Sequence, residues 1–160
     1  MKRLYIWLVL LMSCAAFAAD MPYDEAADAR ADVKHALIDA MANHKPVLLI
    51  FGANWCEDCR ALSTALKVPD TAKLMDAQFN IVKINVGRWD KNLDLDTVYG
   101  NPTKAGIPAA VLLAPDQQVL YATRAGELAD ARSMSDQGVY DFFKKIVDTT
   151  ATTTAGATTH

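Results

Sequence analysis

The chain has 160 residues, of which 52% are hydrophobic and 22% are charged, and its formal net charge is −3. This length and composition are typical of one compact globular domain. The acidic balance, without a basic stripe or an aromatic-rich basic patch, argues against nucleic-acid binding.

The N-terminal residues have the pattern of an export signal. Lys2 and Arg3 precede an apolar stretch, and Ala16-Phe17-Ala18 then supplies the small residues that a signal peptidase reads. The apolar stretch is shorter than the about 20 residues that a membrane-spanning helix needs. We therefore predict a signal peptide over residues 1–18 and a periplasmic mature protein. The alternative is a lipoprotein signal in which Cys14 becomes a lipidated N-terminus.

Helical and strand patterns alternate in the first half of the mature chain. Residues 26–43 have the spacing of a helix with one apolar face. That face consists of Val33, Leu37, Ala40 and Met41. Pro46 follows the helix, and residues 47–51 form an apolar run that is typical of a strand buried on both sides.

Two cysteines follow this strand directly, in the sequence Trp55-Cys56-Glu57-Asp58-Cys59, and open a second helical pattern. This arrangement suits redox chemistry, because unpaired backbone N–H groups and the helix dipole favour a thiolate in the first turn. A structural disulfide is the alternative. A bridge that closes so short a loop, however, removes little entropy from the unfolded chain.

The remaining elements complete one domain over residues 19–148. Pro69 separates the second helix from a short third helix over 71–77. The further predicted elements are a strand over 79–86, a helix over 93–99, a hairpin with strands over 109–114 and 119–122, and a final helix that ends near Asp148. Residues 149–160 are rich in Thr, Ala and Gly, and we predict a disordered tail there.

The order of these elements, together with Trp55-Cys56-Glu57-Asp58-Cys59 and Gly106-Ile107-Pro108, resembles the thioredoxin superfamily over most of the mature chain. The resemblance implies an α/β thioredoxin fold: a central mixed β-sheet flanked by helices, here with an N-terminal helix extension. Within the superfamily, Ala53-Asn54-Trp55-Cys56 is similar to exported thioredoxin-like proteins and to the C-terminal periplasmic domain of DsbD, a transmembrane reductant carrier.

The resemblance also implies residue roles. Cys56 would be the exposed nucleophile, Cys59 the buried resolving thiol, and Pro108 a cis-proline that faces them. Trp55 and Ile107 would belong to the substrate-docking surface. The only redox group implied is the Cys56–Cys59 disulfide, with no further cofactor and no metal, and the partners would be thiols and disulfides of proteins or small molecules.

Two departures from thioredoxin concern proton transfer and charge. Ile50 stands where thioredoxins carry a buried acid that accepts a proton from the resolving thiol, and Glu57, Asp58 or water are candidates to replace it. Glu57 and Asp58 also replace the Gly-Pro of thioredoxin. Two carboxylates near a thiolate disfavour it, so we expect a raised Cys56 pKa. The reduction potential should then lie nearer thioredoxin's about −270 mV than the about −120 mV of the oxidant DsbA.

The sequence therefore predicts an exported thiol–disulfide oxidoreductase on the reductase or isomerase side. Because the nicotinamide-dependent reductants are cytosolic, the exported protein would need a membrane donor of the DsbD type. Two alternatives stay open: the cysteine pair could carry a soft metal ion such as Cu(I), or the fold could be a redox-inert module that binds peptides. We expect a monomer.

Overall fold

The computed structural model describes residues 21–156, with side chains up to residue 151. A four-stranded sheet has the order β2-β1-β3-β4. The strands are β1 (Val47–Gly52), β2 (Asn80–Asn85), β3 (Ala109–Leu113) and β4 (Val119–Ala122). β1 pairs in parallel with β2 and antiparallel with β3, and β3 and β4 form the predicted antiparallel hairpin. The predicted mixed sheet is confirmed.

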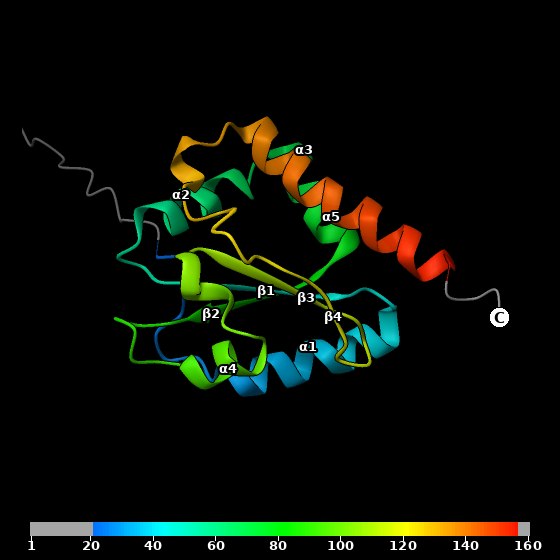
Figure 1. The fold of residues 1–160 in the computed structure, drawn as a ribbon, viewed down its shortest axis with the longest axis horizontal. Helices are drawn as coiled ribbons and strands as arrows, with labels where there is room; N and C mark the ends of the chain where they lie inside the picture. The colour runs from blue at the N-terminus through cyan, green and yellow to red at the C-terminus, as the bar shows by residue number, and fades with distance from the viewer. Residues whose placement is uncertain (1–20, 157–160) are drawn as a thin grey trace, which may run out of the picture.

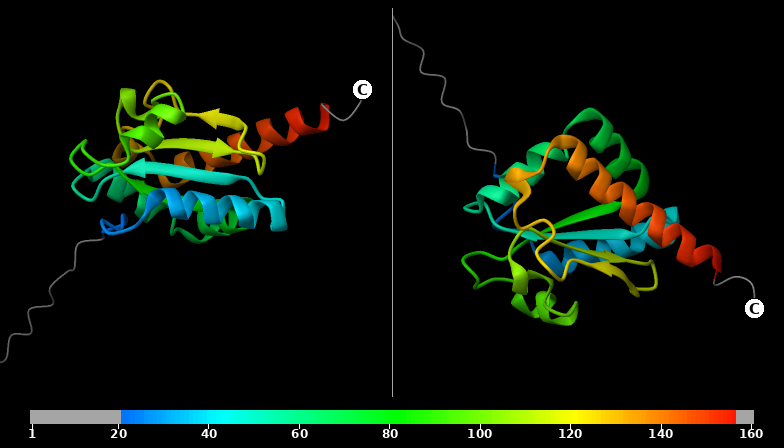
Figure 2. Two further views of the ribbon diagram at one scale, coloured as in Figure 1. Left: turned by 90° about the horizontal axis from the view of Figure 1, so that it is seen from below. Right: turned by 45° about the horizontal axis from the view of Figure 1, so that its top comes forward.

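Helices cover both faces of this sheet (Figures 1 and 2). One face carries α1 (Ala29–Asn43) and α4 (Leu93–Val98). The other face carries α2 (Glu57–Ala65), α3 (Pro69–Gln78) and α5 (Asp136–Gly156). Two short 3-10 helices, η1 (Pro102–Ala105) and η2 (Ala131–Ser133), precede β3 and α5. The sequence patterns did not indicate either of them.

The central strand β1 explains why two layers of helices are needed. All six of its residues are buried. Leu49 and Phe51 pack on the α1 side, whereas Leu48 and Ile50 pack on the side of α2, α3 and α5. A strand with apolar side chains on both faces is stable only between two covering layers, and the loop at the C-terminal end of this strand leads to Cys56.

Helix α1 begins at a capped end and packs on the sheet through small residues. Asp28 caps it by accepting hydrogen bonds from the backbone N–H groups of Arg30 and Ala31, both at 3.1 Å. The buried face consists of Ala29, Val33, Ala36 and Ala40. Met41 was predicted on this face but is 59% exposed. Each residue advances about 100° around a helix, so the neighbour of buried Ala40 points away from the sheet.

Helix α5 continues to Gly156, although a disordered tail was predicted from Thr149. The Thr149 hydroxyl donates a hydrogen bond to the Lys145 carbonyl at 2.8 Å, and the Thr150 hydroxyl donates to the Ile146 carbonyl at 2.9 Å. Between Gly138 in the first turn and Gly156 at the end, the helix contains no proline and no glycine. The boundary predicted at residue 148 was therefore too early.

The predicted signal peptide over residues 1–18, with Cys14, lies outside the described part of the chain. Within residues 21–156, no helix has both the length and the apolar character needed to cross a membrane.

Candidate active site at the start of helix α2

Cys56 is the N-cap residue of α2 and is joined to Cys59 by a disulfide, with the two Cα atoms 5.2 Å apart. Its Sγ accepts a hydrogen bond from the Cys59 backbone N–H at 3.1 Å. The first N–H groups of a helix lack partners within the helix and carry the positive end of its dipole. If reduction forms a thiolate on Cys56, the Cys59 backbone N–H is therefore already placed to donate a hydrogen bond to it.

The loop before β3 brings a second motif to the cysteines. The peptide bond between Ile107 and Pro108 is cis, as the resemblance implied. The Ile107 carbonyl oxygen lies 3.6 Å from Cys56 Sγ, although the two residues are 51 positions apart in the sequence. In the disulfide form Cys56 is 6% exposed and Cys59 is 1% exposed. Cys56 was expected to be exposed, but in this disulfide form it is buried and only slightly more accessible than Cys59.

Two tryptophans form an exposed aromatic surface beside the disulfide. Trp55 is 45% exposed and Trp89 is 44% exposed, and their rings meet edge to face with centroids 6.4 Å apart. The Trp55 indole N–H donates to the Gly87 carbonyl at 2.7 Å, which fixes the ring against the loop that carries Trp89. A groove of about 750 Å³, lined in part by Trp89, Leu93 and Gly106, continues this surface toward the cis-proline loop.

Trp89 was missed as a site residue, because residues 87–92, between the strand predicted over 79–86 and the helix predicted over 93–99, are a polar stretch typical of a loop. A large aromatic side chain within that polar stretch was the available signal. Its partner could not be read from the sequence, since the contact depends on how two loops meet in space.

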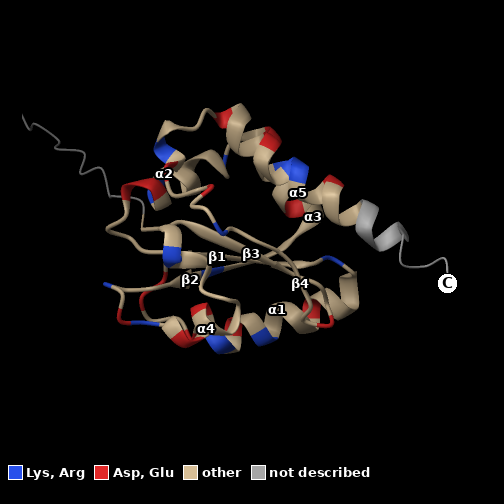
Figure 3. Cartoon of the chain, in the orientation of Figure 1, with Lys and Arg blue, Asp and Glu red and all other residues tan. Residues whose placement is uncertain are grey.

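Arg132 contacts both acids of the cysteine motif. Its guanidinium forms an ion pair with Glu57, and its Nε lies 3.5 Å from Asp58 Oδ1. The same Asp58 oxygen accepts the Arg132 backbone N–H at 3.0 Å. In Figure 3, acidic and basic segments lie together at α2. Through these contacts Asp58 connects α2 to η2. Its side chain is only 14% exposed, so it is not a freely solvated residue.

This pairing corrects the charge prediction made from the sequence, which assumed two uncompensated carboxylates beside Cys56. A second cation adds to the compensation: the Arg60 guanidinium donates to the Asn54 carbonyl at 2.7 Å, on the loop that leads into the motif. The carboxylates therefore oppose a Cys56 thiolate less than predicted, because nearby positive charges offset them.

The residue at the position of the thioredoxin acid faces away from the cysteines. Ile50 is 1% exposed and packs in the apolar cluster on the side of α2, α3 and α5, whereas Cys56 and Cys59 belong to the cluster on the α1 side. Glu57 and Asp58, the predicted substitutes, are engaged by Arg132. Among the contacts of the described residues, none places a carboxylate where it could accept the proton of Cys59.

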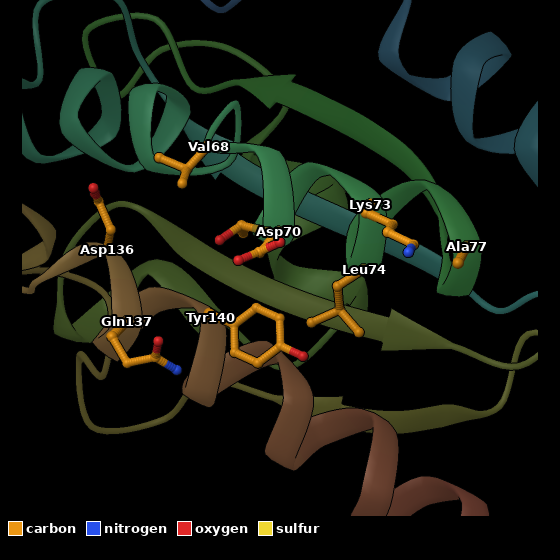
Figure 4. Close-up of a pocket in the computed structure, with 9 residues that line it drawn as sticks. Val68, Asp70, Lys73, Leu74, Ala77, Asp136, Gln137 and Tyr140 are labelled. Atoms are coloured by element: carbon orange, nitrogen blue, oxygen red, sulfur yellow. The ribbon is translucent and has the colours of Figure 1, made fainter.

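Two further observations concern ligands. Within residues 21–156, no group of three or more His, Cys, Asp or Glu side chains is placed to hold a metal ion. A groove of about 550 Å³ lies between α3 and α5, where Leu74 and Tyr140 point toward each other (Figure 4). Neither cysteine lines it, so it is separate from the redox pair.

A disulfide at the N-terminus of a helix, next to a cis-proline loop at the same end of a mixed sheet, defines the class of thiol–disulfide oxidoreductases. Residues 28–115 match the family model described as thioredoxin-like, and the chain belongs to this family. A solved structure described as a disulphide isomerase from Xylella fastidiosa Temecula1 is 53% identical, with a TM-score of 0.79, covering 81% of this chain and 98% of that one.

More distant structures share the fold. The C-terminal domain of Neisseria meningitidis DsbD in the oxidised form is 22% identical, with a TM-score of 0.53, over 72% of this chain and 94% of that domain. A thioredoxin from Thermus thermophilus is 20% identical, with a TM-score of 0.52, over 72% of this chain and 82% of that one. At these identities the likeness shows the fold alone. No curated protein sequence matches the chain.

Proposed function

We propose that this protein is an exported thiol–disulfide oxidoreductase that works as a reductase or an isomerase. The observation that carries the proposal is the position of Cys56 Sγ, which lies at the N-terminus of α2 between the Cys59 N–H and the Ile107 carbonyl. The description of the 53% identical Xylella structure as a disulphide isomerase supports the same direction.

In the proposed reaction, the Cys56 thiolate attacks a substrate disulfide and forms a mixed disulfide with one substrate sulfur. Cys59 then attacks Cys56 Sγ, which releases the reduced substrate and restores the Cys56–Cys59 disulfide. In isomerisation, the second substrate thiol resolves the mixed disulfide instead, and Cys59 is not consumed. The two sulfurs carry both electrons, so the couple needs no other cofactor.

The substrate segment would lie along the loop that contains Ile107 and Pro108, with its apolar side chains against Trp55 and Trp89. Two features support this placement. Both indole rings are almost half exposed beside the disulfide, and the groove next to Trp89 leads to Gly106. Aromatic side chains of this kind supply much of the contact energy at protein interfaces.

Export and a membrane donor complete the proposal. The charged start, apolar stretch and small residues within positions 1–18 support secretion. In an oxidising compartment a reductase or isomerase must be kept reduced, and a donor of the DsbD type is the partner that would supply electrons. Lipid anchoring through Cys14 is the alternative form of export.

Trapping of the mixed disulfide tests the proposed function. The reduced Cys59→Ser variant should accumulate a covalent adduct with a disulfide-bonded peptide, seen by mass spectrometry as an added mass that dithiothreitol removes. Cys56→Ser, the matched control with the other thiol intact, should form no such adduct within the same time. Absence of an adduct in Cys59→Ser, or an equal adduct in both variants, would reject Cys56 as the nucleophile.

The metal-carrier alternative has a separate test. Two thiolates can bind Cu(I), but within the described residues no third ligand of the His, Cys, Asp or Glu type joins the pair. We expect reduced protein to lose Cu(I) to a competing chelator. Stoichiometric retention that Cys56→Ser abolishes would favour the carrier.

A further inference from the structure

Tyr23 is a buried ionisable residue that the chemistry described so far does not use. It precedes α1, is 3% exposed, and belongs to the apolar cluster that also contains Cys56 and Cys59. Burial raises the pKa of its phenol above the ordinary value. The hydroxyl therefore keeps its proton at neutral pH and can donate a hydrogen bond.

Gly52, the last residue of β1, shows where this hydroxyl lies. A Cβ atom at Gly52 would be 2.2 Å from the Tyr23 hydroxyl oxygen and 2.9 Å from Cys59 Sγ. The hydroxyl oxygen and the sulfur therefore both lie next to the one position that a Cβ atom would occupy, and they are separated by no more than these two distances together. Any larger residue at position 52 would displace the phenol, so the end of β1 has room for Tyr23 only because it is glycine.

Asn54 attaches Tyr23 to the active-site loop. The Tyr23 backbone N–H donates to Asn54 Oδ1 at 2.9 Å, and Asn54 Nδ2 donates to the Tyr23 carbonyl at 2.8 Å. Asn54 lies two residues before Cys56, so the segment that carries the phenol is fixed to the redox motif. Both hydrogen bonds use the backbone of Tyr23, and neither uses its hydroxyl.

The buried sulfur of Cys59 needs such a donor. To release a substrate, Cys59 must become a thiolate, and a buried anion is unstable without a hydrogen bond. The acid of thioredoxin is replaced by Ile50, which faces the other side of the sheet, and the acids of the motif are held by Arg132. Among these groups, the Tyr23 hydroxyl is the polar one that lies beside Cys59.

We propose that the Tyr23 hydroxyl donates a hydrogen bond to the Cys59 thiolate during release of the substrate. This inference rests on the proposed function. In this step Cys59 loses its proton to water and its sulfur attacks Cys56 Sγ. The Cys56–Cys59 bond forms, the bond from Cys56 to the substrate breaks, and the substrate sulfur leaves as a thiolate that takes up a proton from water. The protein dithiol is oxidised, the substrate disulfide is reduced, and Tyr23 keeps its proton throughout.

The Tyr23→Phe variant tests the proposal, because it removes the hydroxyl and keeps the ring. Tyr121→Phe, on strand β4, is the matched control. Reduced protein is mixed with a disulfide-bonded peptide, quenched with acid and analysed by mass spectrometry, which separates formation of the mixed disulfide from its resolution. We expect resolution to slow about tenfold in Tyr23→Phe, as for loss of a hydrogen bond to a charged group. Formation by Cys56 should be unchanged, and the control should match the wild type.

Resolution at the wild-type rate in Tyr23→Phe would overturn the inference and leave the proposed function intact. A wild-type protein that forms no mixed disulfide would instead reject the proposed function, and this inference with it. A fluorinated tyrosine placed at position 23 tests the same bond with the phenol retained. Its hydroxyl is a stronger donor, so resolution should be faster than in the wild type, and an unchanged or slower rate would also overturn the inference.

Discussion

At the scale of single residues, Arg132 determines how strongly the acids of the motif act on the redox pair. It lies 75 positions from Glu57 and 74 from Asp58 in the sequence, yet its guanidinium contacts both carboxylates. Glu57 and Arg132 are largely exposed, so solvent screens their ion pair, whereas Asp58 is partly shielded.

Replacement of Arg132 should make the disulfide harder to reduce. In Arg132→Ala the carboxylates of Glu57 and Asp58 lose their cation, and they then oppose the negative charge of a Cys56 thiolate. Exposed ion pairs contribute about 0.2–1 kcal/mol, so the reduction potential should fall by on the order of 10 mV. Equilibration with glutathione measures the shift, and Arg124→Ala, a change at a different loop, should leave the potential unchanged. A potential that rises in Arg132→Ala would contradict this view of the charges.

At the scale of elements, the segment before α1 is held to the loop after β1 by one side chain. Asn54 hydrogen-bonds to the backbone of Tyr23 and, at 3.1 Å, to the Glu25 carboxylate. The Lys91 ammonium adds a hydrogen bond to the Glu25 carbonyl at 3.1 Å. Together these contacts hold Tyr23 over the buried sulfur.

Loss of the Asn54 side chain should loosen this segment. We expect Asn54→Ala to lower the free energy of unfolding by about 1–3 kcal/mol, because the partly buried backbone groups of Tyr23 lose their partner. The Tyr23 amide should also exchange faster with deuterium. Asn80→Ala is the matched control, since the Asn80 side chain bonds the Lys45 carbonyl at 2.9 Å far from the cysteines. Equal protection of the Tyr23 amide in both variants would show that Asn54 does not hold the segment.

Local patterns in the sequence predicted most of the fold and the centre of the site. The apolar run of β1, the cysteines at the start of α2 and the cis bond before Pro108 all depend on residues close in sequence, or on a motif with one known geometry. Arg132, Trp89 and Tyr23 could not be assigned in this way. Their roles depend on tertiary contacts between loops that are distant in the sequence. Such contacts leave no local pattern in a single sequence.

At the scale of the whole molecule, two apolar clusters on opposite faces of the sheet hold the layers together, and the redox pair belongs to only one of them. Phe143 of α5 lies at the centre of the other cluster and is fully buried. Its ring packs edge to face with Phe79, at a centroid distance of 6.5 Å. The redox pair and Phe143 therefore belong to clusters on opposite faces of the sheet. That the molecule is a monomer stays a prediction.

Two adjacent phenylalanines on α5 test the packing of the second cluster, because one ring is fully buried and the other only partly buried. Phe143→Ala should lower the free energy of unfolding by about 3–5 kcal/mol, the usual cost of a large cavity in a core. Phe142→Ala should cost less, because that ring is only partly buried. Urea unfolding with the disulfide intact measures both. A loss in Phe142→Ala that equals or exceeds the loss in Phe143→Ala would contradict the packing described here.

The most direct test of the proposed reductase or isomerase function is the equilibrium reduction potential of the Cys56–Cys59 pair, measured against glutathione with thiol trapping and mass spectrometry. We predict a value below roughly −170 mV, on the side of thioredoxin at about −270 mV. The acids of the motif support that side, because Arg132 offsets them only in part and they still oppose a Cys56 thiolate. A value above roughly −170 mV, approaching DsbA at about −120 mV, would contradict this charge argument and a reductase role, and would make the protein an oxidant or an isomerase.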